Sequence, residues 1–427
     1  MAISPARIAA YEVLLRVERD RAFTSILLPQ YQANMSEKDA ALCQQLVLGV
    51  LRRKFYLDAV ISQFSAKRKL DLEVVTAIRL GAYQILELDR IPDYSAVNES
   101  VQLVRRAKKA SAKGFVNAIL RRIAKRGPLP ESGDSIETAS IETSHPRWLL
   151  ERWIQQFGRE RALAIAEANN QPPRLAFRFT GHPEPEVPQE ANPSQIVEGG
   201  YTVEKFTREL KELAEAGQIY FQDEASQLIA RSVQIPDSGT FLDVCASPGG
   251  KTSLAAKANR GRSLTLAAGD VHQARVELLR SNCISQGFPE VLVARYDAVA
   301  ALPFADGSFD AILVDAPCSG TGTIRSNPEI RYFLRPDDIE ELSRKQLTIL
   351  TNASNLLRKG GKLYYSTCSL EREENEGVIA KFLDEHNEFR HVEDGIYKRF
   401  RTDEGFGRTF PDRDGTDGFF FAILERD

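Results

Sequence analysis

Apolar residues recur at helical spacing through the first part of the chain. Ile8 and Leu15 fall on one helix face, and Ser36 and Asp39 have the spacing of a capping box ahead of another apolar stripe. Comparable spacing continues to residue 126, with none of the strict alternation that marks a half-buried strand. The pattern predicts an all-α bundle over residues 1–126.

The middle of the chain changes character twice. Residues 127–144 combine Gly, Pro and Ser with a Ser/Thr/Glu run and lack apolar periodicity, which predicts a linker. Helical spacing then returns over 145–170, and strict alternation over 174–180 predicts a half-buried strand. Short strand and helix signals follow, so we expect a small α+β module over residues 145–220.

Strand and helix signals alternate from residue 221 to the end of the chain. Helical stretches separate most of the short apolar runs, as in a doubly wound parallel sheet. These runs occupy residues 241–245, 264–269, 291–296, 309–314, 362–366 and 418–424. The pattern predicts an α/β, Rossmann-like domain over 221–427, and the whole chain is therefore expected to be multidomain.

Composition narrows the class of protein. The 427 residues are 43% hydrophobic and 27% charged, as in a soluble globular protein. The sequence has no uncharged apolar run of about 18 residues, the length that a membrane-spanning helix needs. Charged residues also interrupt the short N-terminal apolar run, which would be continuous in a signal peptide. Five irregularly spaced cysteines fit a reducing cytoplasm. The net charge of −3 means that any basic surface must be local, and we expect a cytoplasmic monomer.

A glycine-rich loop follows the first strand of the α/β domain. Gly249 and Gly250 let the backbone approach a ligand closely, and free amides at the start of the next helix favour an anionic group. The loop matches neither G-x-G-x-x-G nor G-x-x-x-x-G-K-[ST]. Asp270, at the end of the second strand, can accept hydrogen bonds from ribose hydroxyls. We therefore expect a nucleoside-bearing cofactor without a pyrophosphate.

Two cysteines follow the fourth and fifth strands. Carboxyl ends of parallel strands meet at the ligand-binding edge of a sheet, so Cys318 and Cys368 should lie together there. A lone cysteine is most often a small buried hydrophobe, but two at neighbouring strand ends favour a chemical role. The sequence contains no C-x-x-C, and its five histidines are not grouped near these positions, so we expect no metal.

A thiolate is suited to attack an electrophilic ring carbon. Cytosine C5 is too weak a nucleophile to take a methyl group directly, whereas thiolate addition at C6 gives an enamine whose C5 can attack a methyl sulfonium. Loss of the C5 proton and elimination of the thiol then restore the ring. Asp315, just before Cys318, is placed to act as the acid near N3 and N4 of the base.

Residues 245–252, 315–322 and 366–369 resemble the cofactor loop and the two cysteine motifs of the S-adenosylmethionine-dependent RNA 5-methylcytosine methyltransferases. The resemblance implies that Cys368 is the nucleophile and that Cys318 assists product release. DNA cytosine methyltransferases use the Pro-Cys cysteine instead, so the presence of both favours RNA. The resemblance also implies an S-adenosylmethionine site lined by Cys245, Ala246, Ser247, Pro248, Gly249, Gly250, Lys251, Asp270, Asp297 and Asp315.

The N-terminal bundle resembles the NusB-like RNA-binding domain, most clearly over residues 91–101 and 113–120. A basic run without acids follows Val101. Such a run is often only a solvated face, but beside an RNA enzyme it is expected to contact phosphates. The candidate RNA-binding residues are Arg105, Arg106, Lys108, Lys109, Lys113, Arg121 and Arg122. A NusB-like domain joined to this catalytic domain is the arrangement of the bacterial 16S ribosomal RNA cytosine-C5 methyltransferases, which implies small-subunit ribosomal RNA as the partner and no membrane.

Three other functions stay open. One is a non-enzymatic RNA-binding assembly factor in which the bundle does the work, and another is a nicotinamide oxidoreductase. The intact loop, Asp270 and the two cysteines disfavour the first, and the missing G-x-G-x-x-G disfavours the second. A cytosine-C5 methyltransferase acting on tRNA is the third.

Overall fold

The computed structural model describes residues 3–65, 69–127, 135–393, 395 and 397–427. These form two compact units, one of Met1–Gln171 with Ile324–Leu334 and the other of Pro172–Thr323 with Arg335–Asp427. Within the described ranges, no helix combines the length and the apolar character needed to cross a membrane.

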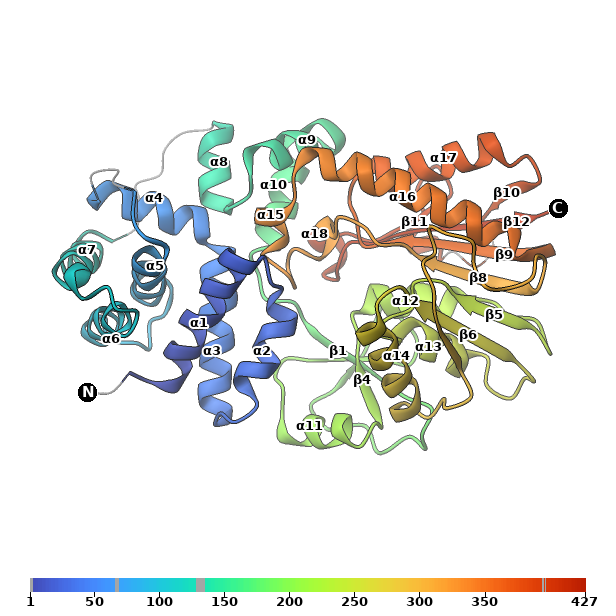
Figure 1. Ribbon diagram of the computed structural model, residues 1–427, viewed down its shortest axis with the longest axis horizontal. Helices are drawn as coiled ribbons and strands as arrows, with labels where there is room; N and C mark the ends of the chain where they lie inside the picture. The colour runs from blue at the N-terminus through green and yellow to red at the C-terminus, as the bar shows by residue number, and fades with distance from the viewer. Residues whose placement is uncertain (1–2, 66–68, 128–134, 394, 396) are drawn as a thin grey trace. The chain divides into compact units, whose positions relative to one another are not determined.

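The first unit is helical, as the sequence predicts (Figure 1). Ser36 accepts a hydrogen bond from the Asp39 amide at 3.2 Å, which confirms the predicted cap. The elements are α1 (Pro5–Asp20), α2 (Thr24–Gln32), α3 (Glu37–Arg52), α4 (Lys54–Phe64), α5 (Leu72–Glu87), α6 (Asp93–Arg106), η1 (Ala110–Ala112), α7 (Lys113–Arg126), α8 (Ile136–Thr143), α9 (Arg147–Phe157), α10 (Arg159–Ala168) and α15 (Ile330–Phe333).

Two expected boundaries differ from the structure. The linker expected over 127–144 contains α8, whose Ala139 and Thr143 are buried, while its residues 128–134 lie outside the described part of the chain. The α+β module expected over 145–220 is divided, because α9 and α10 pack with α8 in the first unit and the strands that follow belong to the second. Periodicity alone identified the elements but could not say which core each would join.

A small antiparallel sheet opens the second unit, with the strand order β2-β3-β1-β4. The strand predicted over 174–180 is confirmed as β1, and its Phe177 and Phe179 are buried in a small core of their own. The elements are β1 (Leu175–Phe179), β2 (Asn192–Pro193), β3 (Gly200–Val203), α11 (Arg208–Glu215) and β4 (Ile219–Phe221).

The larger sheet has the strand order β10-β12-β9-β8-β5-β6-β7, with β11 paired to β12. All the strands predicted for this domain are present, and β5 to β9 pair in parallel while β12 runs antiparallel to β9. The strands are β5 (Thr240–Asp243), β6 (Thr265–Asp270), β7 (Leu292–Arg295), β8 (Phe309–Asp315), β9 (Leu357–Thr367), β10 (Phe389–Val392), β11 (Gly407–Arg408) and β12 (Phe420–Arg426).

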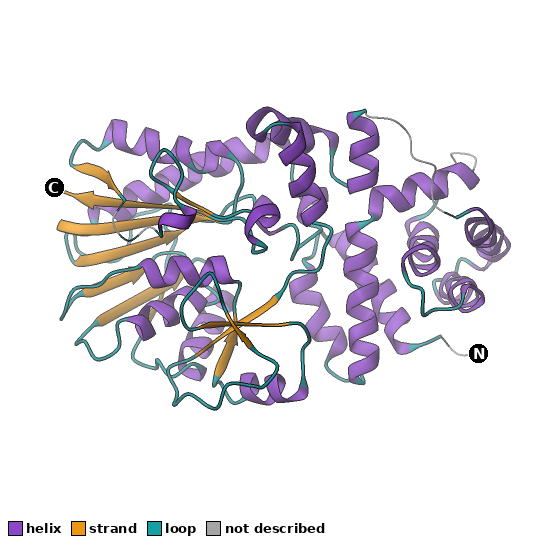
Figure 2. Ribbon diagram, turned by 180° about the vertical axis from the view of Figure 1, so that it is seen from behind, coloured by secondary structure: helices purple, strands orange, loops and turns teal. Residues whose placement is uncertain are grey.

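Helices cover both faces of this sheet, as the two ribbon views show (Figures 1 and 2). Buried side chains of α16 and α17 pack on one face, and those of α12, α13 and α14 pack on the other. The strands are therefore apolar on both sides, which explains their continuous apolar runs. These helices and the remaining short elements are α12 (Glu224–Ser232), α13 (Gly250–Ala258), α14 (Gln273–Ser285), η2 (Thr321–Thr323), α16 (Pro336–Asn355), η3 (Arg372–Glu374), α17 (Glu376–Glu385), η4 (Lys398–Phe400) and α18 (Pro411–Asp414).

The strand order reverses between β5 and β8, because the chain continues to β6 and β7 on one side of β5 and to β8 and β9 on the other. In open α/β sheets, ligands bind outside the carboxyl ends of the strands at such a switch point. The topology therefore places the candidate site where the loops after β5 and β8 leave the sheet.

The short segment 324–334 belongs to the helical unit although it follows the Cys318 loop in sequence. Its Arg331 is fully buried and donates to Asn170 Oδ1 at 2.9 Å, to the Thr143 carbonyl at 3.2 Å and to the Asn169 carbonyl at 3.3 Å. Glu329 accepts from the amide of Thr24 at 2.7 Å. One guanidinium thus satisfies acceptors from several chain segments in the core of the helical unit.

Arg331→Met should destabilise the helical unit, because it keeps the apolar stem but leaves buried oxygens without their donor. Each acceptor left unsatisfied costs about 1–3 kcal/mol. We expect a lower midpoint of urea unfolding followed by circular dichroism. Arg90→Met, at an exposed position, is the matched control and should leave the midpoint unchanged. Equal midpoints for the two variants would show that Arg331 contributes no net stability.

Candidate active site

The carboxyl ends of the parallel strands bring aspartates to one edge of the sheet. Asp243 ends β5, Asp270 ends β6, Asp315 ends β8, and Asp297 follows β7. The sequence singled out Asp270, Asp297 and Asp315 but not Asp243. Its position directly before the glycine-rich loop was the signal that could have identified it.

Asp243 is buried, and its carboxylate accepts a hydrogen bond from Thr252 Oγ1 at 2.7 Å. This bond joins the end of β5 to the first turn of α13, across the glycine-rich loop. Burial raises the pKa of Asp243 to about 7, although the hydrogen bond from Thr252 opposes the shift. The carboxyl can therefore hold a proton close to neutral pH.

The glycine-rich loop fits tightly against its surroundings. Gly249 has a φ of 103°, and a Cβ built there would lie 2.9 Å from the Leu279 side chain. A Cβ on Gly250 would lie 2.9 Å from Tyr220 Cε1. Because of this close approach, glycine is required at both positions. The first backbone amides of α13 lie next to the loop, and amides at a helix N-terminus can bind an anionic group.

Other elements hold this loop from outside. Asn282 on α14 donates to the Pro248 carbonyl at 2.8 Å, and the Ala246 amide donates to Gly269 O at 2.9 Å. Burial, followed by the nearby carboxylates, raises the pKa of Cys245, so this thiol stays neutral. Residues 245–251 are therefore held in place at the edge of the candidate site, and Cys245 is not expected to act as a nucleophile.

Arg178 on β1 is a buried residue that the sequence did not single out. Its Nη2 donates to the Gly250 carbonyl and to Ser253 Oγ, both at 2.8 Å, and to Gln286 Oε1 at 2.9 Å. Burial lowers its pKa to about 10. Alternation along β1 places Arg178 on the face opposite Phe177 and Phe179, where a charged residue is expected, so the sequence carried no signal for its role. Through Arg178 the small sheet fixes the first turn of α13.

The acidic side chains at the strand ends fit a nucleoside with a cationic group. Asp270 accepts from the His272 amide at 3.2 Å and lies 3.5 Å from Arg275 Nε, while Asp297 accepts from the Val299 amide at 3.0 Å. Carboxylates can accept further bonds from ribose hydroxyls and an exocyclic amine, and they favour a neighbouring sulfonium. The residues present therefore suit S-adenosylmethionine.

Asp315 links the cofactor loop to the neighbouring strand. Its Oδ2 accepts from Lys251 Nζ at 2.7 Å, and its Oδ1 accepts from Ser366 Oγ on β9 at 2.6 Å. Burial tends to lower the pKa of Lys251, but the surrounding negative groups, Asp315 foremost, more than offset it and the pKa is raised. An ammonium and a carboxylate therefore stand together beside the cysteine loops.

The structure brings Cys318 and Cys368 together, with their sulfur atoms 3.2 Å apart. The loops that carry them follow β8 and β9, which are adjacent and parallel as expected. The hydrogen bond to Cys368, followed by burial, raises the pKa of Cys318. Two negative charges at this distance would repel strongly, so the pair carries at most one.

The other cysteines have different surroundings. Cys43 and Cys283 are buried in separate hydrophobic cores, where burial raises the pKa of each thiol. Among the described residues, no group of three or more His, Cys, Asp or Glu side chains is arranged to hold a metal ion.

The basic run lies on α6, α7 and the turn between them in the helical unit. Some of its charges already have acidic partners, because Arg106 lies 3.2 Å from Glu12 and Lys109 lies 2.7 Å from Asp71. Lys113 is half-buried. The remaining candidates are exposed, namely Arg105, Lys108, Arg121 and Arg122.

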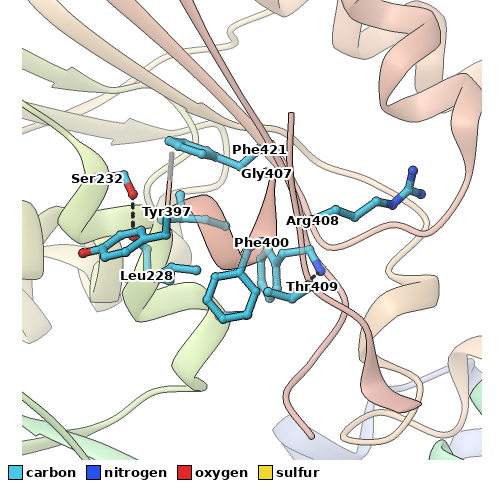
Figure 3. Close-up of a pocket in the computed structure, with 11 residues that line it drawn as sticks. Leu228, Ser232, Tyr397, Phe400, Gly407, Arg408, Thr409 and Phe421 are labelled. Carbon is cyan, nitrogen blue, oxygen red and sulfur yellow. Dashed lines mark hydrogen bonds between the residues drawn. The ribbon is translucent and has the colours of Figure 1, made fainter. Parts of the chain in front are cut away.

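A separate hollow lies between α12 and the strands β11 and β12 (Figure 3). Leu228, Phe400 and Phe421 give it a mainly hydrocarbon lining, and the bordering Ser232 hydroxyl donates to the Leu228 carbonyl at 2.9 Å. Neither the paired cysteines nor the strand-end aspartates line it. The candidate catalytic and cofactor-binding residues therefore lie apart from this hollow.

Comparison with known proteins identifies related families for three parts of the chain. Residues 231–425 match the family described as 16S rRNA methyltransferase RsmB/F, and residues 4–125 match the NusB family. Residues 145–179 match the ferredoxin-like domain of RsmF/B-like methyltransferases. The predicted fold classes of the bundle, of the small α+β module and of the catalytic domain are thus confirmed.

Similar proteins extend over nearly the whole chain. The probable ribosomal RNA small subunit methyltransferase B of Bacillus subtilis is 33% identical, with 98% of each chain covered. The ribosomal RNA small subunit methyltransferase B of Pseudomonas putida is 32% identical, again with 98% of each covered. A methyltransferase homologue from Pyrococcus horikoshii of known structure is 27% identical, with a TM-score of 0.59 over 69% of this chain and 100% of that one. Because identity at this level extends from end to end, the chain belongs to the RsmB/F family of S-adenosylmethionine-dependent 16S rRNA methyltransferases.

Proposed function

We propose that this enzyme methylates C5 of a cytosine in 16S ribosomal RNA through a covalent bond between Cys368 and C6. The observation that carries the proposal is the pair of thiols 3.2 Å apart at the ends of β8 and β9. A methyltransferase acting on an exocyclic amine or a ribose hydroxyl has no need of two adjacent thiols, whereas C5 of cytosine requires a nucleophile at C6 and a route for its departure.

The thiols have different roles in this reaction. We assign the attack on C6 to Cys368, as the resemblance of its Thr-Cys motif implies, while the hydrogen bond to Cys368 and burial raise the pKa of Cys318 and favour its protonated form. Addition moves the C5–C6 electron pair onto C5, and C5 then takes the methyl group that S-adenosylmethionine supplies as a sulfonium. The target base has to leave any stack to reach both sulfurs.

Product release requires a second step. The proton that remains on C5 passes to a water molecule that acts as base, and its bonding pair reforms the C5–C6 double bond as Cys368 departs from C6 with the C6–S electron pair. We assign assistance of this step to Cys318, because its protonated thiol lies 3.2 Å from the departing sulfur and can donate a hydrogen bond to it as negative charge develops there. The ring is then aromatic again, and Cys368 is regenerated as a thiolate.

The acid near N3 and N4 of the cytosine is assigned to Asp315 together with Lys251. Addition at C6 raises the electron density on N3, and a positioned proton donor stabilises it. The Lys251 ammonium is 2.7 Å from the Asp315 carboxylate, so the pair can present a donor while Ser366 fixes the carboxylate. The sequence suggested Asp315 alone for this role.

Small-subunit RNA is proposed to contact the exposed basic residues of α6 and α7. Arg105, Lys108, Arg121 and Arg122 place positive charge on the solvent side of the NusB-like bundle, and cations on such a surface bind phosphates with release of counterions. Arg106 and Lys109 contribute less to this surface because acids already neutralise them.

Asp270→Ala should weaken S-adenosylmethionine binding by about 1–3 kcal/mol, or roughly 5- to 150-fold in Kd, because ribose hydroxyls lose their acceptor. Asp270→Asn keeps one acceptor oxygen and should lose less. Titration calorimetry measures both, with the exposed Asp306→Ala as the control. An unchanged Kd for Asp270→Ala would remove this residue from the site.

Cys368→Ala should abolish both methyl transfer and any covalent adduct, because C5 is never activated. Cys318→Ala should still attack and methylate, but it should remain bound to its RNA as an SDS-resistant band that ribonuclease removes. Cys43→Ala, in the core of the helical unit, is the control and should behave as the wild type. A trapped adduct with Cys368→Ala and none with Cys318→Ala would reverse the two roles.

Reversing the charge of Arg121 and Arg122 to Glu should weaken RNA binding and flatten its salt dependence. Each phosphate that is no longer neutralised by a cation lowers the slope of log K against log salt by about 0.7–0.9, so we expect the slope to fall by about 1.5. Reversing the exposed Lys205 and Lys211 changes the net charge equally and serves as the control. If both double variants bind RNA alike, the basic run is only a solvated face.

A further inference from the structure

A buried carboxylate lies behind the two cysteine loops and bonds to both. Glu374 is fully buried at the end of η3, and its Oε1 accepts from the Ser319 amide at 2.8 Å. Its Oε2 accepts from the hydroxyls of Ser319 and Ser369. Ser319 follows Cys318 and Ser369 follows Cys368, so one carboxylate bonds the residue next to each thiol.

Helix α16 supports this carboxylate from the other side. Gln346 Nε2 donates to Glu374 Oε1 at 2.9 Å and to the Pro317 carbonyl at 3.0 Å. The Tyr365 hydroxyl donates to the Glu374 carbonyl at 2.6 Å. Both oxygens of the carboxylate therefore accept more than one hydrogen bond in a buried setting, where an unsatisfied charge would be costly.

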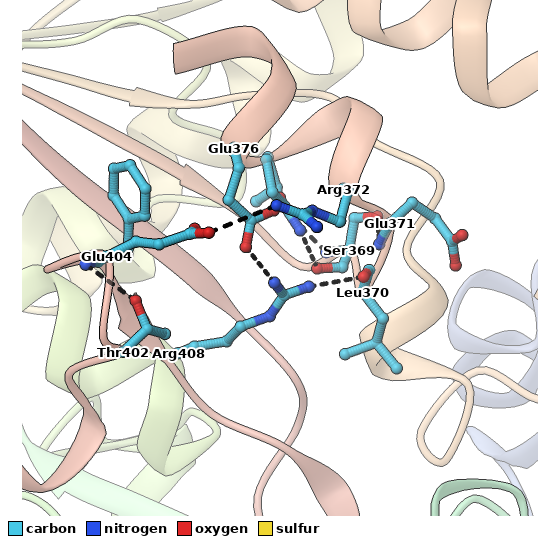
Figure 4. Close-up of polar contacts among 11 residues, drawn as sticks. Ser369, Leu370, Glu371, Arg372, Glu376, Thr402, Glu404 and Arg408 are labelled. Carbon is cyan, nitrogen blue, oxygen red and sulfur yellow. Dashed lines mark hydrogen bonds and ion pairs between the residues drawn. The ribbon is translucent and has the colours of Figure 1, made fainter. Parts of the chain in front are cut away.

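The Cys368 loop has further anchors that do not involve Glu374. Asn375 Nδ2 donates to the Ser369 carbonyl at 2.9 Å, and Thr367 Oγ1 donates to Asn375 Oδ1. Arg408 donates to the Leu370 carbonyl at 2.6 Å and pairs with Glu376 (Figure 4). Together with Glu374, the next two residues in the chain therefore hold this loop, Asn375 directly and Glu376 through Arg408.

The Cys318 loop depends on Glu374 more heavily at the residue beside its thiol. Both the amide and the hydroxyl of Ser319 donate to this carboxylate, and the Ser319 hydroxyl also lies 3.0 Å from Ser369 Oγ. The loop's further bonds to the Cys368 loop lie at Thr321 and Gly322. Removing the carboxylate would take away two of the bonds that hold the residue after Cys318, while Asn375 still held the residue after Cys368.

We propose that Glu374 is a positioning residue that holds the Cys318 loop against the Cys368 loop and so sets the sulfur–sulfur distance needed for product release. This role rests on the covalent mechanism proposed above, in which Cys318 assists departure of Cys368 from C6. Glu374 touches neither thiol by a hydrogen bond of its own and acts through the two serines. Its loss should therefore reproduce the defect of a missing Cys318 although that thiol is present.

The test compares full-length variants on an unmodified 16S rRNA transcript with radiolabelled S-adenosylmethionine. Glu374→Ala should lower steady-state turnover by about 10- to 100-fold, as expected for a misplaced catalytic group, and should accumulate an SDS-resistant, ribonuclease-sensitive adduct. Methyl transfer in a single turnover should fall much less. Glu374→Gln keeps an oxygen for the Ser319 amide and an amide that can donate to both hydroxyls, so it should restore release and leave no adduct.

Two further variants provide an alternative to Glu374→Ala, should it not fold, and a matched control. Ser319→Ala removes a single hydroxyl next to Cys318 and should accumulate a smaller amount of adduct, which settles the question if Glu374→Ala does not fold. Glu385→Gln, at an exposed carboxylate on α17, is the matched control and should turn over as the wild type does.

The outcomes separate this inference from the proposed function. If Cys318→Ala traps RNA but folded Glu374→Ala and Ser319→Ala do not, the positioning role is wrong and the covalent mechanism stands. If single-turnover and steady-state rates of Glu374→Ala fall together without an adduct, Glu374 serves only the fold. If Cys318→Ala itself traps nothing, the proposed mechanism fails and the role of Glu374 fails with it.

Discussion

The parallel pairing of β8 with β9 is the constraint on which the site depends. Asp315 lies opposite Ser366 in this register, and each cysteine follows its strand within a few residues. A shift of one residue would turn every side chain of a strand to the opposite face, so the register decides whether two thiols can meet. The Asp315 and Ser366 side chains are hydrogen-bonded at the last paired position, so side chains as well as backbone fix the register of β8 against β9. The sheet thus provides a rigid base for loops that carry the chemistry.

Burial has a different effect at each ionisable group along this edge. It raises the pKa of Asp243, it helps to raise that of Cys318, and at Lys251 the carboxylate of Asp315 outweighs it. The protonation state of each group along this edge therefore depends on how deeply it is buried and on which charges lie beside it. The proposed mechanism places one charged sulfur beside one neutral sulfur, and electrostatic effects of this kind are strong only where water is largely excluded.

The sequence predicted what depends on local pattern. Alternation and apolar runs identified the strands, and strand ends identified Asp270, Asp315 and the two cysteines as neighbours because parallel topology has few solutions. It could not identify Glu374 or Arg178, since each acts through partners far away in the sequence and each would be read locally as an ordinary charged residue. It also treated the basic run as uniform, whereas Glu12 and Asp71 approach it from other helices. Periodicity defines elements, and only tertiary contacts show which charges are already paired.

The segment 324–334 gives the chain an unusual order of assembly. The polypeptide crosses between the two units after residues 171, 323 and 334, so the helical unit is discontinuous in sequence. During synthesis, its N-terminal helices leave the ribosome long before Arg331 is made, and until then the carbonyls of Thr143 and Asn169 have no guanidinium to satisfy them. The helical unit is therefore the first to begin and the first to be completed, at residue 334, but a long stretch of the other unit interrupts it. The last segment of the helical unit is therefore translated only after β1 to β8 and the Cys318 loop of the other unit have been made.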